Sequence, residues 1–266
     1  MLYRVKEKTL TLPHCRLDYI TFGSGEKKLV MIQGLNTRGI RGAGISLAYM
    51  YRIFAKAYTV YLFDRRPDVR EGLTVREIAE DVAVAMDSLN IRKADIFGVS
   101  QGGMIAQYLA IDRPDLVNKL VLAVTLSRNN PTVEAVVENW ISLTEKRDYK
   151  RLVRDMAYHM YSDAYVRRYK PFMPLLTLVQ TPKDPRRFIS LARACLTCNA
   201  YAELHKIQCP VFVIGGSRDT VVTPEASVEI AQKLGCQIYM YPDLGHGAYE
   251  EASDFNRRVY NFLLEE

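Results

Sequence analysis

Short apolar segments alternate with helical segments along most of this 266-residue chain, and this alternation restricts the possible folds more than any other feature of the sequence. The apolar segments are bounded by turn residues and joined by helices of about 10–15 residues. Such a pattern is typical of right-handed βαβ units whose strands form a buried parallel sheet. It therefore predicts an α/β fold with a mostly parallel central sheet and helices on both of its faces.

The expected strands are 3–11, 16–22, 28–33, 58–63, 94–98, 119–124, 209–215 and 237–241. The expected helices are 46–54, 75–89, 102–112, 224–234 and 253–264. Pro13 and His14 separate the first two strands, which suggests that these strands are antiparallel. Helix 75–89 has the clearest amphipathic pattern, because its apolar residues share one face while acidic residues such as Asp81 fall elsewhere.

The alternation stops between residue 128 and about residue 205. This stretch is rich in Tyr and Arg, has helical character and contains no convincing strand. A chain of this length can hold one large α/β domain or a core with a small insertion. We therefore expect an α/β core made of residues 1–127 and 201–266, with residues 128–200 forming a helical cap.

The formal charge of +6 is concentrated between Lys146 and Arg193. This stretch has twelve Lys or Arg against four Asp, a surplus of eight positive charges, so the rest of the chain carries a net charge of −2. A positive segment over an active site can attract an anionic substrate, although a solvated helical face is the commoner explanation. The basic residues form no recognised nucleic-acid-binding motif, so we expect no nucleic-acid partner.

Composition and cysteine usage are those of a globular protein from a reducing compartment. Hydrophobic residues make up 48% of the chain and charged residues 25%, and no apolar run reaches the roughly 20 residues of a membrane span. The five cysteines are odd in number and scattered, which argues against a disulfide framework. Cys195 and Cys198 form a C-x-x-C pair, but no second pair completes the four ligands of zinc. We therefore expect no metal. Because the first residues lack the apolar run of a signal peptide, we also expect a cytoplasmic protein.

A serine in a glycine-rich turn is the strongest chemical signal in the chain. Strand 94–98 runs into Gly98-Val99-Ser100-Gln101-Gly102, and a helix follows. In a tight strand-to-helix turn the serine takes a strained backbone conformation, and the positions two before and two after it come so close that only small residues fit. Gly98 and Gly102 occupy those positions. The turn predicts that the Ser100 hydroxyl projects above the sheet as a nucleophile.

A serine hydroxyl is a poor nucleophile until a base accepts its proton. Of the four histidines, His14 lies in an early turn, and His159 and His205 lie in or beside the helical insertion. His246 follows strand 237–241 and so lies at the carboxyl edge of the sheet, where the catalytic groups of open α/β sheets gather. We therefore predict that His246 is the base.

The base needs a carboxylate that holds its tautomer and stabilises the imidazolium. Asp219 follows strand 209–215 at the same edge of the sheet. The competing acids are Asp64, after strand 58–63, and Asp243, three residues before the histidine. Asp243 is too close in sequence to reach around the ring and is better suited to shaping the turn, so Asp219 is the predicted acid.

The chain order Ser100, Asp219, His246, with G-x-S-x-G after a central strand, resembles the α/β-hydrolase family. The resemblance covers nearly the whole predicted core, including residues 215–224 around the acid and 245–250 around the base. It fits the small, capped, single-domain relatives, which include carboxylesterases, lactonases, carbon–carbon bond hydrolases and cofactor-free haloperoxidases. It implies a Ser-His-Asp hydrolase that needs no metal and no organic cofactor.

The resemblance also implies where the oxyanion of a tetrahedral intermediate binds. Preorganised N–H groups must meet this negative charge. The implied donors are the backbone N–H of Gln101, next to the nucleophile, and that of Leu35, in the loop after strand 28–33. Relatives usually have His-Gly where this chain has Gln33-Gly34. This change keeps a backbone donor and makes Gln33 and Asn36 candidate contacts to a substrate.

A second departure from the family pattern follows Asp64. Relatives often continue Asp-x-Arg-Gly-x-Gly-x-Ser, whereas this chain has Asp64-Arg65-Arg66-Pro67-Asp68. This loop shapes the structure near the active site, so we expect the change to alter the shape of the pocket and not the chemistry.

Tyrosines recur at three- and four-residue spacing in the expected cap, at Tyr158, Tyr161, Tyr165 and Tyr169. Such a stripe is more often internal packing than a substrate wall. If it faces Ser100, the pocket is aromatic, and Tyr158 and Tyr161 then become candidate substrate contacts.

These observations predict a two-step acyl transfer on a small-molecule carboxylic ester, thioester or lactone, anionic if the basic segment selects it. The same residues could instead serve a carbon–carbon bond hydrolase or a cofactor-free haloperoxidase or perhydrolase, because the bond that is cleaved depends on the pocket. A cap that excludes water would favour an acyltransferase, and a non-catalytic ligand-binding relative is the alternative of a different class. The sequence leaves the oligomeric state open.

Overall fold

The computed structural model describes residues 2–265, which form an eight-stranded sheet in the order β1-β2-β4-β3-β5-β6-β7-β8. The strands are β1 (Lys6–Thr11), β2 (Arg16–Gly23), β3 (Lys27–Ile32), β4 (Tyr58–Phe63), β5 (Ala94–Val99), β6 (Val117–Ala123), β7 (Val211–Gly216) and β8 (Gln237–Tyr241). β2 pairs antiparallel with β1 and with β4, and every pair from β4 to β8 is parallel. The expected α/β fold, with its antiparallel start, is confirmed.

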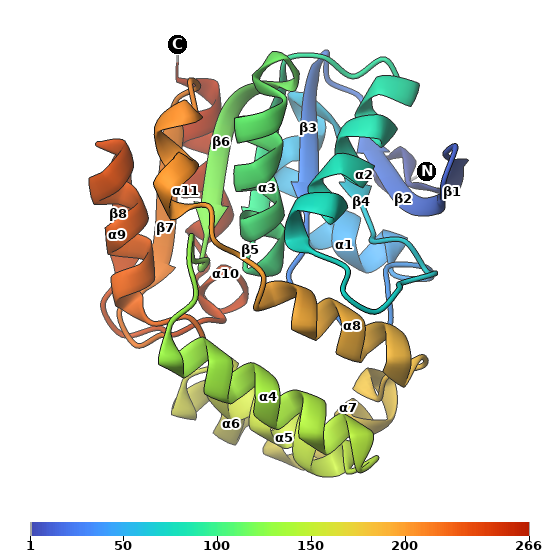
Figure 1. Ribbon diagram of the computed structural model, residues 1–266, viewed down its shortest axis with the longest axis vertical. Coiled ribbons are helices and arrows are strands. Elements are labelled where there is room, and N and C mark those ends of the chain that lie inside the picture. Colours follow the sequence, from blue (N-terminus) through green and yellow to red (C-terminus); the bar gives the residue numbers. More distant parts are fainter. Residues whose placement is uncertain (1, 266) are drawn as a thin grey trace.

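Helices cover both faces of this sheet (Figure 1). One face carries α2 (Val75–Ser88), α3 (Gln101–Asp112) and α9 (Pro224–Leu234), and the other carries α1 (Gly44–Met50), α10 (Ala248–Glu251) and α11 (Phe255–Leu264). Each layer closes its own apolar cluster against the sheet. α3 is buried from Gln101 to Ile111, which is why its sequence is apolar around most of the helix.

Local signals explain where several helices begin and end. α2 starts with a capping box, in which the Thr74 hydroxyl accepts from the Glu77 N–H while the Glu77 carboxylate accepts from the Thr74 N–H. The expected helix 46–54 is divided in the structure. α1 covers Gly44–Met50, and the chain continues as a 3₁₀ helix over Arg52–Lys56. The expected strand 3–11 begins only at Lys6.

Asp81 lies off the apolar face of α2, as expected, and is nevertheless buried. Only 1% of this residue is exposed, and its contacts come from the loop after β4 and from the turn between β1 and β2. Arg66 donates to its carboxylate from Nε at 2.6 Å, and His14 lies 2.8 Å away on the other side. A carboxylate can be buried at this position because a cation compensates its charge.

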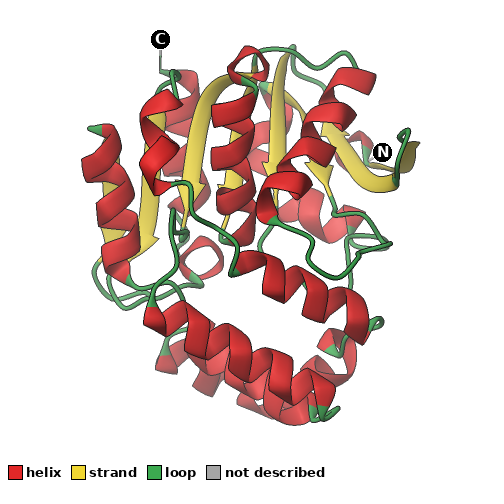
Figure 2. Ribbon diagram, in the orientation of Figure 1, coloured by secondary structure: helices red, strands yellow, loops and turns green. Residues whose placement is uncertain are grey.

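Residues 131–195 form only helices, namely α4 (Pro131–Glu145), α5 (Tyr149–Met160), α6 (Asp163–Tyr169), α7 (Met173–Gln180) and α8 (Pro185–Cys195), with a short 3₁₀ turn between α6 and α7. Four of these helices start at an Asn, Asp or Ser that accepts a hydrogen bond from the first turn. The segment lies beyond the end of the sheet at which β6 and β7 stop (Figures 1 and 2). Within residues 2–265, no helix combines the length and apolar composition needed to cross a bilayer.

Candidate active site

Ser100 sits on a strained turn between β5 and α3. Its backbone has φ 54° and ψ −118°, a conformation that residues other than glycine rarely adopt. Its N–H donates to the Ala123 carbonyl at 2.8 Å. A Cβ added to Gly98 would overlap the backbone of Gly102, and one added to Gly102 would overlap the carbonyl oxygen of Ile32. The close approach predicted for the two glycines is therefore present, and it holds Ser100 at the end of the strand.

His246 lies in the loop after β8 and is hydrogen bonded on both sides of its ring. Its Nε2 is 2.9 Å from the Ser100 Oγ, and its Nδ1 is 2.8 Å from the Asp219 Oδ2. His246 and Asp219 are 3% and 5% exposed. With the ring proton on Nδ1, Nε2 is free to accept the hydroxyl proton of Ser100. The structure thus brings together the three side chains that were predicted from the sequence.

Asp219 is held by the backbone that follows it. Its Oδ1 accepts from the N–H groups of Val221 at 2.8 Å and Val222 at 3.0 Å, which leaves Oδ2 for His246. The competing acids are engaged elsewhere. Asp243 pairs with Arg218 at the surface, and Asp64 pairs with a cation from the helical segment. Asp219 is therefore the carboxylate in contact with the imidazole.

The other histidines lie away from Ser100. His14 contacts Asp81, His159 contacts Thr220 at 3.2 Å, and His205 contacts the carbonyl of Ala202. His14, Cys15 and Asp81 are near enough to one another to share a metal ion, but Arg66 already neutralises the Asp81 carboxylate. This cluster is not part of the site around Ser100.

Two backbone N–H groups beside Ser100 have no acceptor among the described residues, those of Leu35 and Gln101. Gln101 is the first residue of α3, where N–H groups lack an intrahelical partner. Gly34 and Leu35 line the same cavity as Ser100, and a Cβ on Gly34 would lie 3.2 Å from the Ser100 Cβ. Both implied oxyanion donors are thus free at the nucleophile.

A small apolar cavity of about 40 Å³ lies on one side of Ser100 and His246. Its apolar walls come from α3, α4 and the loop after Asp219: Met104, Val133, Val137, Trp140, Val221 and Val222. A larger chamber of about 400 Å³ adjoins it, because Gly34, Leu35, Met156, Met160 and Tyr249 line both. Ser100 therefore stands near the junction of two compartments of unequal size.

The larger chamber contains most of the expected pocket residues. Gln33, Asn36 and Tyr161 line it, and so do Tyr165 and Tyr169, whose rings follow that of Tyr161 at centroid separations of 4.6 Å. Three of the four tyrosines in the stripe thus form a wall of the chamber.

Tyr158 is a correction to the expected pocket. Its side chain is 55% exposed and lines a separate surface cavity together with His159 and Arg154. The inward face of α5 is set by Val153 and Met156, so a residue two positions after Met156 points away. Tyr161 faces inward because the helix has already ended at Met160.

Glu250 is the charged side chain among the residues that line the larger chamber, which has no Lys or Arg in its described lining. The Tyr161 hydroxyl donates to the Glu250 Oε2 at 2.7 Å. Although Glu250 is exposed, partial loss of hydration among its neighbours raises the pKa of this carboxyl. The many basic residues between 146 and 193 thus do not give the chamber a positive lining, and Glu250 was not singled out from the sequence.

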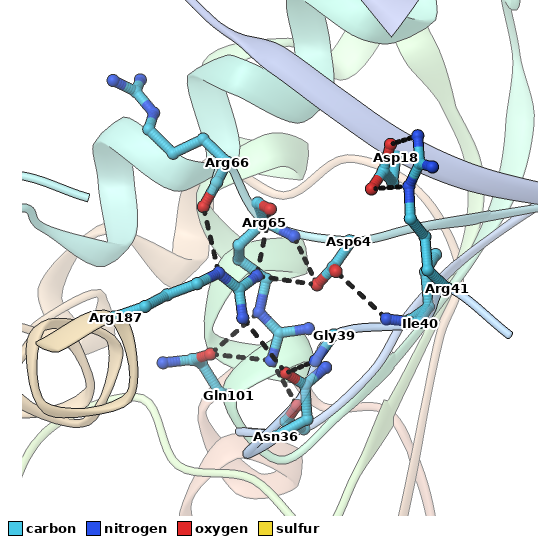
Figure 3. Close-up of polar contacts among 11 residues, drawn as sticks. Asp18, Asn36, Gly39, Ile40, Arg41, Asp64, Arg65, Arg66, Gln101 and Arg187 are labelled. Carbon is cyan, nitrogen blue, oxygen red and sulfur yellow. Dashed lines mark hydrogen bonds and ion pairs between the residues drawn. The ribbon is translucent and has the colours of Figure 1, made fainter. Parts of the chain in front are cut away.

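A polar network that the sequence did not reveal connects α8 to the loops after β3 and β4 (Figure 3). Arg187 of α8 donates to the Asp64 Oδ1 at 3.0 Å and to the Arg65 carbonyl at 3.1 Å. Both ion-pair partners are largely buried, with side-chain exposures of 11% and 8%. Asp64 in turn accepts from the Ile40 N–H at 3.1 Å. The network therefore holds the helical segment against the core beside the site.

Contacts on the other side of the site join the turn after α5 to the loop that carries His246. The Gly247 N–H donates to the Met160 carbonyl at 2.5 Å, and the Ser162 N–H donates to the Glu251 Oε1 at 2.9 Å. The helical segment is therefore anchored directly beside the imidazole.

Comparison with known proteins agrees with this architecture. A family model described as alpha/beta hydrolase fold matches residues 40–253. A Caulobacter sp. (strain K31) protein named as a candidate carbamate hydrolase, RutD, is 24% identical over 85% of this chain and 88% of its own length. The 3-oxoadipate enol-lactonase 2 of Acinetobacter baylyi is 22% identical over 81% of this chain and 80% of its own.

A solved structure has the same fold over nearly all of the chain. The enol-lactonase from Burkholderia xenovorans LB400 superposes with a TM-score of 0.85 at 22% identity, covering 97% of this chain and all of that one. The matched family model spans most of the sheet, the whole helical segment and the loops that carry Ser100, Asp219 and His246. This chain therefore belongs to the alpha/beta hydrolase fold family.

Proposed function

We propose that this chain is a serine hydrolase that cleaves a carboxylic ester, thioester or lactone of a small neutral molecule through an acyl-enzyme intermediate. The observation that carries the proposal is the continuous line of hydrogen bonds from Asp219 through His246 to Ser100. A serine, its base and an orienting acid within hydrogen-bond reach are the arrangement that activates a hydroxyl nucleophile.

In the first step the Ser100 Oγ attacks the substrate carbonyl carbon, and the His246 Nε2 takes the hydroxyl proton. Asp219 stabilises the imidazolium that results. The carbonyl oxygen becomes negatively charged and accepts hydrogen bonds from the N–H groups of Leu35 and Gln101. Preorganised donors of this kind favour the transition state over the ground state, because the full charge exists only after attack.

Collapse of the tetrahedral intermediate breaks the bond to the leaving group, which receives the proton from His246. The acyl group then remains as an ester on Ser100. A water molecule gives a proton to the same Nε2 atom as it attacks this ester, and the proton returns to the Ser100 Oγ when the carboxylic acid leaves. No metal or organic cofactor takes part in the proposed cycle.

The two compartments suggest how a substrate lies across Ser100. The small cavity has a largely apolar lining and suits a short acyl group, whereas the chamber offers tyrosines and the amides of Gln33 and Asn36 to the leaving group. The names of two relatives, a candidate carbamate hydrolase and an enol-lactonase, also refer to carboxyl derivatives. Residues 128–200 would act as the cap that closes the chamber.

The charge of the chamber favours a neutral substrate over an anionic one. Its charged lining residue is the acidic Glu250, and Arg187 of the basic segment is already paired with Asp64. An anionic group in the chamber would approach the Glu250 carboxylate, and the two like charges would repel each other. The basic residues are better explained as a solvated helical face.

A panel of p-nitrophenyl esters from acetate to decanoate, together with a small lactone, tests the proposal. Wild type should hydrolyse the short esters fastest and react with a fluorophosphonate, with a single mass increase on Ser100. Ser100→Ala should lose both reactions. Ser217→Ala is the matched control, because Ser217 is an exposed serine at the same edge of the sheet.

An inert wild type that resists the fluorophosphonate would refute the serine-hydrolase proposal and favour a non-catalytic ligand-binding protein. A wild type that is labelled by the fluorophosphonate but hydrolyses no ester or lactone would instead favour carbon–carbon bond cleavage, perhydrolysis or acyl transfer by the same residues.

A further inference from the structure

Arg65 is a buried cation next to the site without a carboxylate of its own. It is 2% exposed, and its side chain forms no ion pair among the described residues. Its neighbours differ in this respect, since Arg66 pairs with Asp81 and Arg187 pairs with Asp64. Burying a charge without a countercharge is costly, so its position calls for an explanation.

The hydrogen bonds of Arg65 go to two residues beside the nucleophile. Its Nε and Nη2 donate to the Gln101 Oε1 at 3.1 and 2.9 Å (Figure 3). Its Nη2 also donates to the carbonyl oxygen of Gly34. Its Nη1 is buried and has no partner in the described structure. The guanidinium therefore joins the loop after β3 to the start of α3.

The contact with Gly34 determines the direction of a neighbouring N–H group. The Gly34 carbonyl and the Leu35 N–H belong to one planar trans peptide, so they point in opposite directions. An arginine that holds the oxygen on one side therefore aims the Leu35 N–H at the other side. That N–H is one of the two donors in the proposed reaction.

The contact with Gln101 acts on the second donor. The amide of Gln101 is held at both ends, because its Oε1 accepts from Arg65 while its Nε2 donates to the Leu191 carbonyl at 2.6 Å and to the Cys195 Sγ at 3.1 Å. A side chain locked in this way fixes the backbone of the first residue of α3. The N–H of that residue is the other proposed donor.

The charge of Arg65 also acts on the site. Burial lowers the pKa of this guanidinium to about 10, so it remains protonated at neutral pH. The nearby Asp64 carboxylate favours this charge, but it is already ion-paired with Arg187, so it compensates the charge of Arg65 only in part. In a poorly hydrated environment a cation behind two N–H groups polarises them toward an anion in front of them.

We propose that Arg65 is a positioning residue for the oxyanion, which aligns the Leu35 and Gln101 N–H groups and strengthens them with its positive charge. This inference rests on the proposed hydrolase function. Arg65 itself does not touch the substrate, and its effect is largest in the transition state, because the negative charge that it stabilises develops there.

The test compares Arg65→Gln and Arg65→Lys with the matched control Arg66→Gln. Arg66 is the adjacent arginine, is also largely buried, and binds Asp81 without contacting either donor residue. The readouts are kcat and KM for the best short p-nitrophenyl ester, and inhibition by phenylboronic acid, whose adduct on serine is a tetrahedral anion with an oxygen in the place of the oxyanion. Circular dichroism checks that each variant is folded.

We expect Arg65→Gln to lower kcat by about 10- to 100-fold, less than the about 10²- to 10³-fold loss on removing a donor itself. KM should change little, and the inhibition constant of phenylboronic acid should rise in parallel with the loss in kcat. Arg65→Lys should recover part of the rate, because an ammonium keeps the charge but cannot hold both acceptors in the same geometry. Arg66→Gln should lower the melting temperature and leave kcat unchanged.

A folded Arg65→Gln variant that keeps the kcat of wild type, whether or not its KM rises, overturns the proposal. If Arg65→Gln does not fold, Arg65→Lys decides, and a folded lysine variant with unchanged kcat and boronate affinity overturns it. A wild type that neither hydrolyses the esters nor reacts with a fluorophosphonate refutes the proposed function and this inference with it. An active wild type beside an equally active Arg65→Gln refutes only the role of Arg65.

Discussion

The His246 Nε2 lies 2.9 Å from the Ser100 Oγ, although 146 residues separate the two along the chain. β6 and β7 lie between the strands that carry these residues, so the contact does not arise from neighbouring strands. It arises because parallel strands bring their following loops to one edge of the sheet. The loop after β8 also packs closely on the loop after β7, where a Cβ on Gly216 would overlap the carbonyl oxygen of Gly245.

Asp219→Asn should lower kcat by about 10³- to 10⁴-fold, because an amide in this position stabilises the wrong tautomer of His246 and not its cation. Steady-state kinetics on the best ester measures the effect. Asp243→Asn is the matched control, since this acid is three residues from the histidine but pairs only with Arg218 at the surface. Equal losses in the two variants would contradict the assignment of Asp219.

Gly102→Ala should cost more than about 4 kcal/mol of unfolding free energy or prevent folding, because its Cβ would overlap the Ile32 backbone, which cannot move away. Gly72→Ala should cost only about 1 kcal/mol, because Gly72 has φ 76° but open space around it. Urea denaturation measures both. A Gly102→Ala protein as stable as Gly72→Ala would show that the turn can relax.

Arg187→Met should lower the unfolding free energy by about 3–5 kcal/mol, because it leaves the buried Asp64 carboxylate without its cation. Arg186→Met, at the adjacent exposed position, should change it by less than about 0.5 kcal/mol. Chemical denaturation monitored by the fluorescence of Trp140, which lies in α4, reports on both. A similar small effect in the two variants would show that the ion pair contributes little to holding α8.

Glu203→Gln should lower the melting temperature by about 1–3 °C at pH 6, a small effect because the ion pair is partly exposed. Hydrogen bonds from Arg76 and Lys206 lower the pKa of Glu203 to about 2. A carboxyl whose pKa is lowered by folding stabilises the protein at pH values above its pKa in the unfolded state. This stabilisation is lost as the pH falls through the pKa in the folded state. The difference from wild type should therefore shrink between about pH 4.5 and pH 2.

Glu225→Gln, an exposed glutamate without an ion pair in the described structure, should show no such pH dependence in the same melting experiments. A constant difference between wild type and Glu203→Gln across this range would contradict the lowered pKa.

Glu250→Gln should raise kcat/KM for an ester with an anionic leaving group by about two- to fivefold relative to a neutral one, since repulsion by an exposed carboxylate is worth roughly 0.5–1 kcal/mol. The carboxyl has a raised pKa, so wild type should discriminate against the anion less as the pH falls and Glu250 becomes protonated. Glu251→Gln is the control, because Glu251 binds Ser162 and does not line the chamber. A wild type that prefers the anionic ester would contradict the neutral-substrate proposal and support an anionic substrate.

Local sequence signals were sufficient for most of the elements and for the three side chains around Ser100. α9 and β8 were predicted at both ends, because Pro224 can only begin a helix and Gly235 takes the left-handed conformation that ends one. Prediction was wrong where packing overrides the local pattern. Tyr158 follows the spacing of the tyrosine stripe but points outward, away from the chamber.

The sequence by itself determined the alternation of elements, the glycine turn at Ser100 and the loops that follow β5, β7 and β8, because these depend on steric rules among adjacent residues and on the order of strands. Only the tertiary structure decided the two compartments, the ion pair of Asp64 with Arg187, and the contact of Arg65 with Gly34 and Gln101. Those features depend on how distant segments pack and on which buried charge finds a partner, and no local pattern in the sequence encodes either.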